Sequence, residues 1–297
     1  MSIKDTFSLF LLGAIWGGSF IFMRVAAPEF GIYALVEVRT VLATLVLIPF
    51  LMMARAWSDL QRHWKAIAVI GGVNTAVPFV LFNFSSLYLE AGVNAILNAT
   101  APMFGAVIAF AWLKDKLNNV AIVGLIIGFT GVATISVQKV GGGDVTFLPI
   151  LSALLATFCY GLAACMMKRW LHNVKPLAVA TGSQAFAAIM LLPFALVTWP
   201  EAMPSSGAWM NAIALALGGT GIAYILYFNL IANIGPAKAI TVAYLVPLFG
   251  IGWGLMFLNE TLSFQSMLGG VLILTGVALT TGITAKFARR KAITGQS

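Results

Sequence analysis

Residues 101–117, APMFGAVIAFAWLKDKL, and residues 246–262, VPLFGIGWGLMFLNETL, follow one pattern. Each stretch has a proline at its second position, continues as an apolar run through a Phe-Gly pair, and ends in a short polar segment. The second stretch lies 145 residues after the first. The same spacing relates two later pairs, Gly124 with Gly269 and Gly131-Val132-Ala133 with Gly276-Val277-Ala278. The chain therefore contains an internal duplication built from apolar segments.

The composition requires a lipid environment. Hydrophobic residues make up 61% of the 297 positions, charged residues 9%, and the mean hydropathy is +0.98. A soluble domain is nearer half apolar and a quarter charged, so a water-soluble fold could not bury this much apolar surface. With two cysteines and two histidines, a disulfide framework and a Cys/His zinc site are excluded, and we expect no metal and no cofactor.

The apolar runs have the length of transmembrane helices, which need roughly 17–25 mostly apolar residues each. The runs are continuous rather than alternating, which disfavours a membrane β-barrel. Polar breaks separate ten candidate spans, at residues 7–26, 32–53, 66–89, 93–113, 120–138, 147–167, 177–199, 209–233, 237–258 and 264–285. We therefore predict an all-α integral membrane protein with ten transmembrane helices.

Basic residues gather in alternate loops. With the N-terminus in the cytoplasm, fourteen of the 17 Lys and Arg residues fall in cytoplasmic segments, Lys139 alone lies outside, and Arg24 and Arg39 lie within spans. Because positive charge marks the cytoplasmic side, both termini are predicted there, in a multi-pass protein of the inner (plasma) membrane. Topology thus explains the net charge of +8. We expect the lipid bilayer as partner and no nucleic acid, in a monomer, with a dimer as the alternative.

The duplication divides the chain into two halves of opposite orientation. Near the start of each half the spacing is 144 residues, which pairs Met23-Arg24 with Met167-Lys168. The first half, 1–141, and the second half, 142–297, each contain five predicted spans. Because five is odd, the second half enters the membrane in the opposite sense. Two inverted five-helix repeats are typical of secondary transporters, in which two bundles move about a site near the midplane.

At Leu12–Arg24, the sequence LGAIWGGSFIFMR resembles the first span of EamA-type exporters of the drug/metabolite transporter superfamily. The C-terminal part resembles the second domain of that family more closely, through Gly219–Tyr227, Gly235–Ala237, Pro247–Gly250, Asn259–Leu262 and Gly269–Val277. The first copy departs from the family pattern, with Lys114-Asp115-Lys116 where a Glu-centred sequence is usual. The resemblance covers nearly the whole chain. It implies a ten-helix pseudo-symmetric bundle whose central cavity serves the export of amino acids or other small metabolites.

Three charged residues, Arg24, Glu37 and Arg39, lie inside predicted spans. An intramembrane charge is costly unless it is paired or hydrated, so each is a candidate for function. Arg24 and Glu37 lie at similar depth and are expected to pair. Arg39 then has two interpretations: a snorkelling side chain, or a cavity residue that attracts a substrate carboxylate. The family resemblance implies a basic residue at both Arg24 and Arg39.

Polar and aromatic side chains on several spans are expected to line a cavity with Arg39. For any one of them, packing between helices is the alternative. As a set, they are better explained as a substrate site with apolar surface and polar handles. The predicted substrate-binding residues are Trp16, Arg39, Asn83, Asn98, Tyr160, Tyr224, Tyr227 and Tyr244.

Proline and glycine mark candidate hinges. Pro102 and Pro247 are matched across the duplication, and each is expected to kink its helix and free a backbone carbonyl. With Gly105 and Gly250 they are predicted gate residues, and a purely structural kink is the alternative. GxxxG pairs, which allow close helix approach within the chain, occur at Gly13/Gly17, Gly124/Gly128 and Gly250/Gly254.

The sequence favours transport over catalysis. It has no GxxxxGK[ST] phosphate loop, no HExxH and no GxSxG, so we expect neither direct ATP hydrolysis nor an enzyme. The predicted function is a secondary exporter of a small metabolite such as an amino acid, working by alternating access. An importer or exchanger of another metabolite is the first alternative, and an intramembrane enzyme, a channel or a receptor is a weaker one. Glu37 is the one acid inside a span, so tight proton coupling is not expected.

Overall fold

The computed structural model describes residues 1–141 and 147–282, and within these ranges the chain forms helices and no strand. Three helices contain a π-helical segment, η1, η2 or η3. The elements are α1 Ile3–Phe30, α2 Ile32–Met53, α3 Trp57–Gly71, η1 Gly72–Ala76, α4 Val77–Ser86, α5 Ala91–Asn98, α6 Ala101–Ile108, η2 Ala109–Leu113, α7 Asn119–Gly141, α8 Phe147–Trp170, α9 Pro176–Val197, α10 Ser206–Ala216, η3 Leu217–Ile222, α11 Ala223–Ile234, α12 Pro236–Ala239, α13 Val242–Leu258 and α14 Phe264–Thr280.

Eight of the described helices are long and apolar enough to cross a membrane. Three of the eight are composite: α3, η1 and α4 form one, α5, α6 and η2 another, and α10, η3 and α11 the third. Two shorter apolar helices, α13 and α14, follow them. Each of the ten apolar runs of the sequence overlaps one of these helices, although some runs extend a few residues past a helix end and residues 283–285 lie outside the described ranges.

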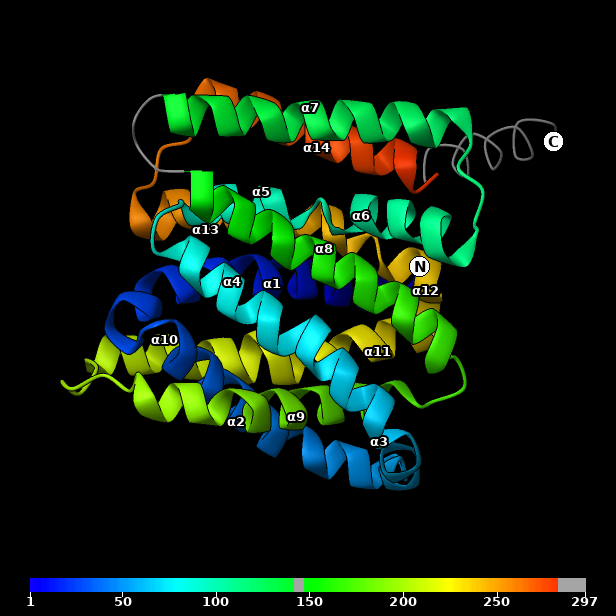
Figure 1. Cartoon of the computed structure of the whole chain (residues 1–297), viewed down its shortest axis with the longest axis vertical. Helices are drawn as coiled ribbons and strands as arrows, with labels where there is room; N and C mark the ends of the chain where they lie inside the picture. Colours follow the sequence, from blue (N-terminus) through cyan, green and yellow to red (C-terminus); the bar gives the residue numbers. More distant parts are fainter. Residues whose placement is uncertain (142–146, 283–297) are drawn as a thin grey trace.

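Short polar or glycine-containing sequences mark where the helices begin and end. Ser2 and Asp5 form a capping box at the start of α1, and Ser205 and Ser263 cap α10 and α14 through their side chains. Gly31 has φ +73° and joins α1 directly to α2. These signals keep several connections short, so neighbouring helices lie antiparallel in one bundle (Figure 1).

The pair α7 and α14 packs through glycine. The two helices lie side by side at one edge of the bundle and run in opposite directions (Figure 1). A methyl group on Gly276 would lie 2.5 Å from the Gly124 carbonyl oxygen, and one on Gly131 would lie 2.5 Å from the Gly269 carbonyl oxygen. The two backbones are therefore in contact. Because lipid tails are as apolar as the helix surfaces, the hydrophobic effect does not drive helix association in a membrane, and such close van der Waals packing stabilises the pair instead.

Two further glycine contacts join other helix pairs. A methyl group on Gly17 of α1 would lie 2.7 Å from the backbone nitrogen of Gly250 in α13. A methyl group on Gly161 of α8 would lie 2.5 Å from the backbone nitrogen of Gly105 in α6. Gly17 and Gly161 are 144 residues apart, and Gly105 and Gly250 are 145 apart, so the two contacts correspond under the duplication.

The matched prolines occupy different local structures. The helix is interrupted between Asn98 and Ala101, and Pro102 lies in the first turn of α6 that follows. Thr100 fills the interruption, where its hydroxyl donates to the Leu97 carbonyl at 2.7 Å. Pro247 instead lies inside α13, which is unbroken from Val242 to Leu258. The helix is thus interrupted just before Pro102, whereas it continues through Pro247.

Candidate functional site

One cavity of about 650 Å³ lies inside the bundle. Helices from both halves of the chain line it, including α1, α2, α4, α6, α8, α9 and α11. It extends to the α8–α9 connection, at the same end of the bundle as the N-terminus (Figure 1). Of the predicted site residues, Trp16, Arg39, Asn98, Pro102, Gly105, Tyr160, Tyr224 and Tyr227 line this cavity.

Arg39 projects from α2 into the cavity and is 7% exposed. Its Nε donates to Thr220 Oγ1 at 2.9 Å, and its Cζ lies 3.6 Å from the centre of the Phe79 ring. The guanidinium also lies 4.0 Å from Met23 Sδ. Neither ion pair in the described part of the chain includes Arg39, so this buried cation is held by a hydroxyl, a ring face and a sulfur atom.

Aromatic rings form much of the cavity wall. Trp16 and Tyr227 have ring centres 5.3 Å apart, and Phe82 stacks on Tyr160 at 6.1 Å. Tyr224 stacks on Phe228 at 6.0 Å. The rings thus provide a large apolar surface beside the Arg39 cation, which suits an organic molecule with an anionic group.

Two of the polar residues that line the cavity come from π-helical segments. Asn74 belongs to η1, and Thr220 belongs to η3. A π turn widens the helix and shifts its backbone hydrogen bonds, which is common at functional sites. Gly72 and Leu217, which begin η1 and η3, are 145 residues apart, so the two π segments occupy corresponding positions in the halves.

Several predicted site residues lie elsewhere. The Asn83 side chain is 1% exposed and donates to the Ile32 carbonyl at 3.1 Å, so it joins α4 to the start of α2. The Tyr244 hydroxyl lies 3.1 Å from Thr281 Oγ1 at the end of α14. Pro247 and Gly250 are buried in α13, where Gly250 contacts α1. These residues connect helices and do not line the cavity.

The expected ion pair between Arg24 and Glu37 is not formed in the described structure. Arg24 Nη1 donates to the Ser86 carbonyl at 2.8 Å, at the end of α4. Glu37 is 7% exposed, and its Oε2 has no hydrogen-bond partner among the described residues. Equal depth in neighbouring helices was not sufficient for pairing, because Arg24 reaches an unsatisfied helix-end carbonyl instead.

The polar residues that line the cavity but were not predicted as site residues include Ser19, Asn74 and Ser183. A signal for Ser183 was present, since it lies 144 residues after Arg39 and so occupies the matched position in the second half. Asn74 gave no signal beyond its polarity in an apolar run. No cluster of three or more His, Cys, Asp or Glu that could hold a metal occurs in residues 1–141 and 147–282.

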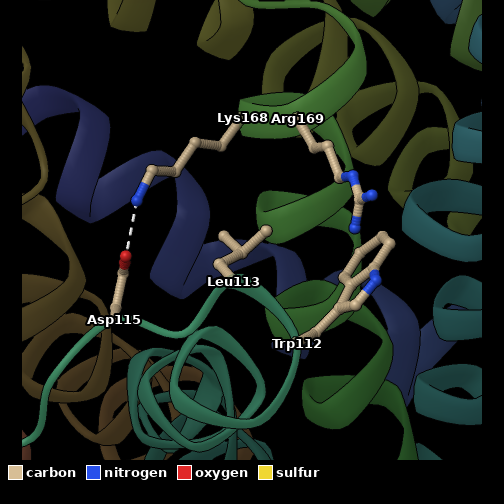
Figure 2. Close-up of a pocket in the computed structure, with 5 residues that line it drawn as sticks. All are labelled: Trp112, Leu113, Asp115, Lys168 and Arg169. Carbon is tan, nitrogen blue, oxygen red and sulfur yellow. Dashed lines mark hydrogen bonds and ion pairs between the residues drawn. The ribbon is translucent and has the colours of Figure 1, made fainter.

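A second, smaller hollow of about 430 Å³ lies outside the bundle core, between η2 and the end of α8 (Figure 2). Lys168 Nζ donates to Asp115 Oδ2 at 2.8 Å, and the Arg169 guanidinium lies 5.2 Å from the Trp112 ring centre. The Lys168 and Asp115 side chains are 63% and 50% exposed, so water screens their ion pair and it contributes little. The hollow is a surface feature, with the larger cavity as the better candidate site.

The end of the bundle opposite the N-terminus is held by several polar contacts. Glu260 follows α13, and its carboxylate accepts from the backbone nitrogen of Ala91 at 3.0 Å, which caps α5. The Ser205 hydroxyl donates to Glu29 Oε1 at 2.8 Å, and Lys139 forms an ion pair with Glu90. The cavity thus extends to one end of the bundle, while these contacts join helices at the other end.

The long apolar helices and the internal cavity define a multi-pass membrane protein. A model of the EamA-like transporter family matches residues 6–137 and, a second time, residues 147–282. The chain therefore belongs to the EamA-like transporter family, so it is a transporter rather than an enzyme, with a small-molecule substrate as its class of partner.

Relatives match over nearly the whole chain. "Uncharacterized transporter YvbV" of Bacillus subtilis (strain 168) is 24% identical over 91% of this chain and 89% of its own length. "Uncharacterized transporter YoaV" of the same organism is 23% identical over 97% and 99%. The "Probable terminal-alkyne amino-acid exporter" of Streptantibioticus cattleyicolor is 24% identical over 93% of both chains. A solved chain described as "Crystal structure of protein" has a TM-score of 0.67 at 16% identity and covers 97% of this chain and 99% of its own, which shows a shared fold.

Proposed function

We propose that the chain is a secondary exporter of a small organic anion, such as an amino acid, which binds in the central cavity with its carboxylate at Arg39. The observation that carries the proposal is the burial of Arg39 beside the cavity with no acidic partner in the described residues. An arginine at the centre of a membrane helix costs about 2.5–3.5 kcal/mol. A substrate carboxylate would supply the missing charge and use the planar guanidinium donors.

Inverted repeats, 1–141 and 142–297, are the proposed basis of transport. Three kinds of observation support them: the two matches to one family model, the matched π segments, and the corresponding glycine contacts. In the α7·α14 pair, exchanging the halves converts the Gly124–Gly276 contact into the Gly131–Gly269 contact. Because these two helices are antiparallel, the axis that exchanges them lies in the membrane plane, as in inverted-repeat transporters.

Ten membrane spans follow from adding α13 and α14 to the eight long helices. Each of the two has 17 residues, at the lower limit for spanning, and α12 precedes α13 at the cytoplasmic side. The distribution of Lys and Arg supports the proposal that both termini are cytoplasmic and that the protein lies in the inner membrane. In this orientation Lys139 and Asp144 are expected outside the cell, and Arg62 and the tail after Lys286 in the cytoplasm. Asp144 and Lys286 lie outside the described residues.

Thiol labelling of whole cells tests this orientation. In a chain whose Cys159 and Cys165 are replaced by alanine, we expect an impermeant maleimide to label Met203→Cys, which lies in the exposed α9–α10 connection. Arg62→Cys, exposed at the start of α3, should react only after the cells are permeabilised. The reverse result would contradict the orientation.

Alternating access would use the matched helix regions at Pro102 and Gly105 and at Pro247 and Gly250. Gly105 and Gly250 each pack against a glycine of the other half, Gly161 and Gly17. Contacts between backbones can slide with little side-chain rearrangement, which suits a hinge between two bundles. The proposed motion opens the end that Glu260 now holds and closes the end to which the cavity extends.

The export assay uses growth of bacteria in toxic amino acids and amino-acid analogues. Expression of the wild-type chain should confer resistance to at least one of them. Arg39→Ala should reduce resistance to that of cells without the transporter, at equal membrane abundance, whereas Arg62→Ala should behave as wild type. Normal resistance in the Arg39→Ala strain would remove the anion site. Increased sensitivity on wild-type expression would favour import, the alternative direction.

A further inference from the structure

The hollow between η2 and the end of α8 combines two cations with one acid. Trp112, Leu113, Asp115, Lys168 and Arg169 line it. In Figure 2 the Lys168 and Arg169 side chains leave α8 in opposite directions, and Leu113 lies between them. Lys168 pairs with Asp115, whereas Arg169 takes part in neither ion pair of the described residues and lies over the Trp112 ring. The lining side chains thus carry one more positive than negative charge.

The hollow lies where two apolar helices end. The helices Ala91–Leu113 and Phe147–Trp170 are both long and apolar enough to cross a membrane, and the lining residues come from their last turns or just beyond. Trp112 and Trp170 lie beside the hollow with ring centres 6.0 Å apart. Tryptophan and basic residues gather where the hydrocarbon of a bilayer meets the lipid headgroups. The hollow therefore has the depth and the residues of the headgroup region.

An exposed apolar stripe on α8 leads from the membrane interior toward the hollow. Leu151, Leu155 and Phe158 are exposed and follow one another at spacings of four and three residues, so they share one face of the helix. Arg169 lies eleven residues after Phe158, about three turns further on, and belongs to the same face. An acyl chain that lies along this stripe would bring its headgroup to Arg169.

The charged groups of the hollow suit a phosphodiester. A guanidinium can donate two parallel N–H bonds to phosphate oxygens, and the Lys168 ammonium can donate from the other side. The pair between Lys168 and Asp115 is exposed and screened by water, so a phosphate can take the ammonium from the carboxylate at little cost. A headgroup with one net negative charge balances the lining, whereas a zwitterionic headgroup leaves one positive charge unbalanced.

We propose that the hollow binds an anionic phospholipid, with the phosphate between Lys168 and Arg169 and an acyl chain along the exposed stripe of α8. This site is separate from Arg39 and does not depend on which substrate the cavity takes. The end of α8 that holds the lipid also lines the cavity through Met167, and Leu171 follows directly. The lipid thus stabilises the end of α8 where the cavity reaches the end of the bundle.

Native mass spectrometry of the purified full-length protein counts bound lipids and tests the site. The probes are phosphatidylglycerol and phosphatidylcholine with identical acyl chains, which share the phosphate and differ in net charge. The wild type should bind phosphatidylglycerol about fivefold or more tighter. Lys168→Gln with Arg169→Gln should bring this ratio close to one. Arg62→Gln with Lys65→Gln is the matched control and should keep the ratio, because it removes two exposed cations, one of them over the Trp64 ring, that lie outside the hollow.

Asp115→Asn tests the same site with the opposite sign. The substitution removes the carboxylate that competes with the phosphate for Lys168 and keeps the size of the side chain. Affinity for phosphatidylglycerol should therefore rise about two- to fivefold. A folding defect cannot produce such a gain, so this variant decides the question if the double variant of Lys168 and Arg169 does not fold.

Free phosphates identify the source of the phosphate group. Inorganic phosphate and glycerol 3-phosphate lack acyl chains, so neither should displace phosphatidylglycerol even in large excess. Displacement by either compound would show a site for a soluble phosphate and overturn the lipid site.

The lipid measurements can overturn it as well. Equal affinity of the wild type for the two lipids would do so, as would an unchanged ratio in the Lys168 and Arg169 double variant. A ratio that falls equally in the Arg62 and Lys65 control would show attraction to the basic surface in general. An unchanged or lower affinity of Asp115→Asn for phosphatidylglycerol would contradict the placement of the phosphate at Lys168.

Discussion

Two pairs of helices matched by the duplication, α7 with α14 and α2 with α9, pack against each other, and the residues at their contacts differ in kind. Between α7 and α14 the contact residues are glycines, with carbonyl oxygens and backbone nitrogens of one helix against the other. Between α2 and α9 the matched positions carry Arg39 and Ser183, and Glu37 and Gln184 are buried beside them. In the first pair, glycines without side chains allow the two backbones to come into contact. The second keeps polar side chains, and two of them, Glu37 and Ser183, have a side-chain oxygen with no hydrogen-bond partner among the described residues.

The difference separates assembly from binding. In lipid, close backbone packing is a main source of helix association, so the α7·α14 pair can hold the halves together without polar groups. Unpaired polar groups destabilise a membrane bundle, and their retention in α2 and α9 is explained when a ligand completes them. Variants in the two pairs should therefore affect different properties: stability in one and ligand affinity in the other.

The largest effect on stability is expected for Gly276→Ala. The added methyl would lie 2.5 Å from the Gly124 carbonyl oxygen and from the Gly128 nitrogen, so α7 and α14 must separate. Overpacking of this kind costs about 1–3 kcal/mol. We expect a lower thermal midpoint and aggregation in size-exclusion chromatography. Gly252→Ala, on the open side of α13, should leave both unchanged. Equal stability of the two variants would show that the α7·α14 contact does not hold the bundle.

A smaller effect is expected for Thr220→Val, and on affinity rather than stability. The substitution removes the acceptor that holds Arg39 Nε at 2.9 Å and keeps the side-chain shape. Loss of one such bond is worth about 1 kcal/mol, so binding of a carboxylate probe should weaken about fivefold. Thr220→Ser retains the hydroxyl and should restore affinity. If the serine variant is as weak as the valine variant, packing rather than orientation of Arg39 explains the loss.

The smallest effect is expected for Glu37→Gln. Glu37 lies two residues from Arg39 on α2 but does not line the cavity in the described structure, so it is not placed to meet both sides of the membrane in turn. In liposomes, the wild type and Glu37→Gln should both equilibrate labelled substrate without a pH gradient. Accumulation driven by a pH gradient, and lost in Glu37→Gln, would make Glu37 a proton site and contradict this expectation.

Hydropathy predicted the spans well and the site only partly. Length and apolarity decide whether a segment is long enough for a bilayer, so the runs 32–53 and 120–138 correspond closely to α2 and α7. The direction of each side chain depends on which face meets another helix, and these helices are apolar on all faces. Asn83 and Tyr244 therefore looked like cavity residues although they bond Ile32 and Thr281.

The interpretation succeeded where chemistry and the duplication agreed. Arg39, Tyr160 and Tyr224 line one cavity, as charge and polar handles within apolar spans suggested. The Arg24–Glu37 pair failed because depth alone does not fix a partner when a helix-end carbonyl, that of Ser86, is within reach. Ser183 was missed because serine is common in membrane helices, and only its position 144 residues after Arg39 distinguishes it.

The central claim is that Arg39 binds the carboxylate of the substrate. Affinities of the purified protein for L-phenylalanine and L-phenylalaninamide, and for L-leucine and L-leucinamide, test it most directly. In each pair the amide replaces the negatively charged carboxylate with a neutral carboxamide. We predict that the wild type prefers the acid by about 10–100-fold in at least one pair, and that Arg39→Gln reduces this ratio to near one. A preference that persists in Arg39→Gln, or a wild type that binds acid and amide equally, would contradict the claim.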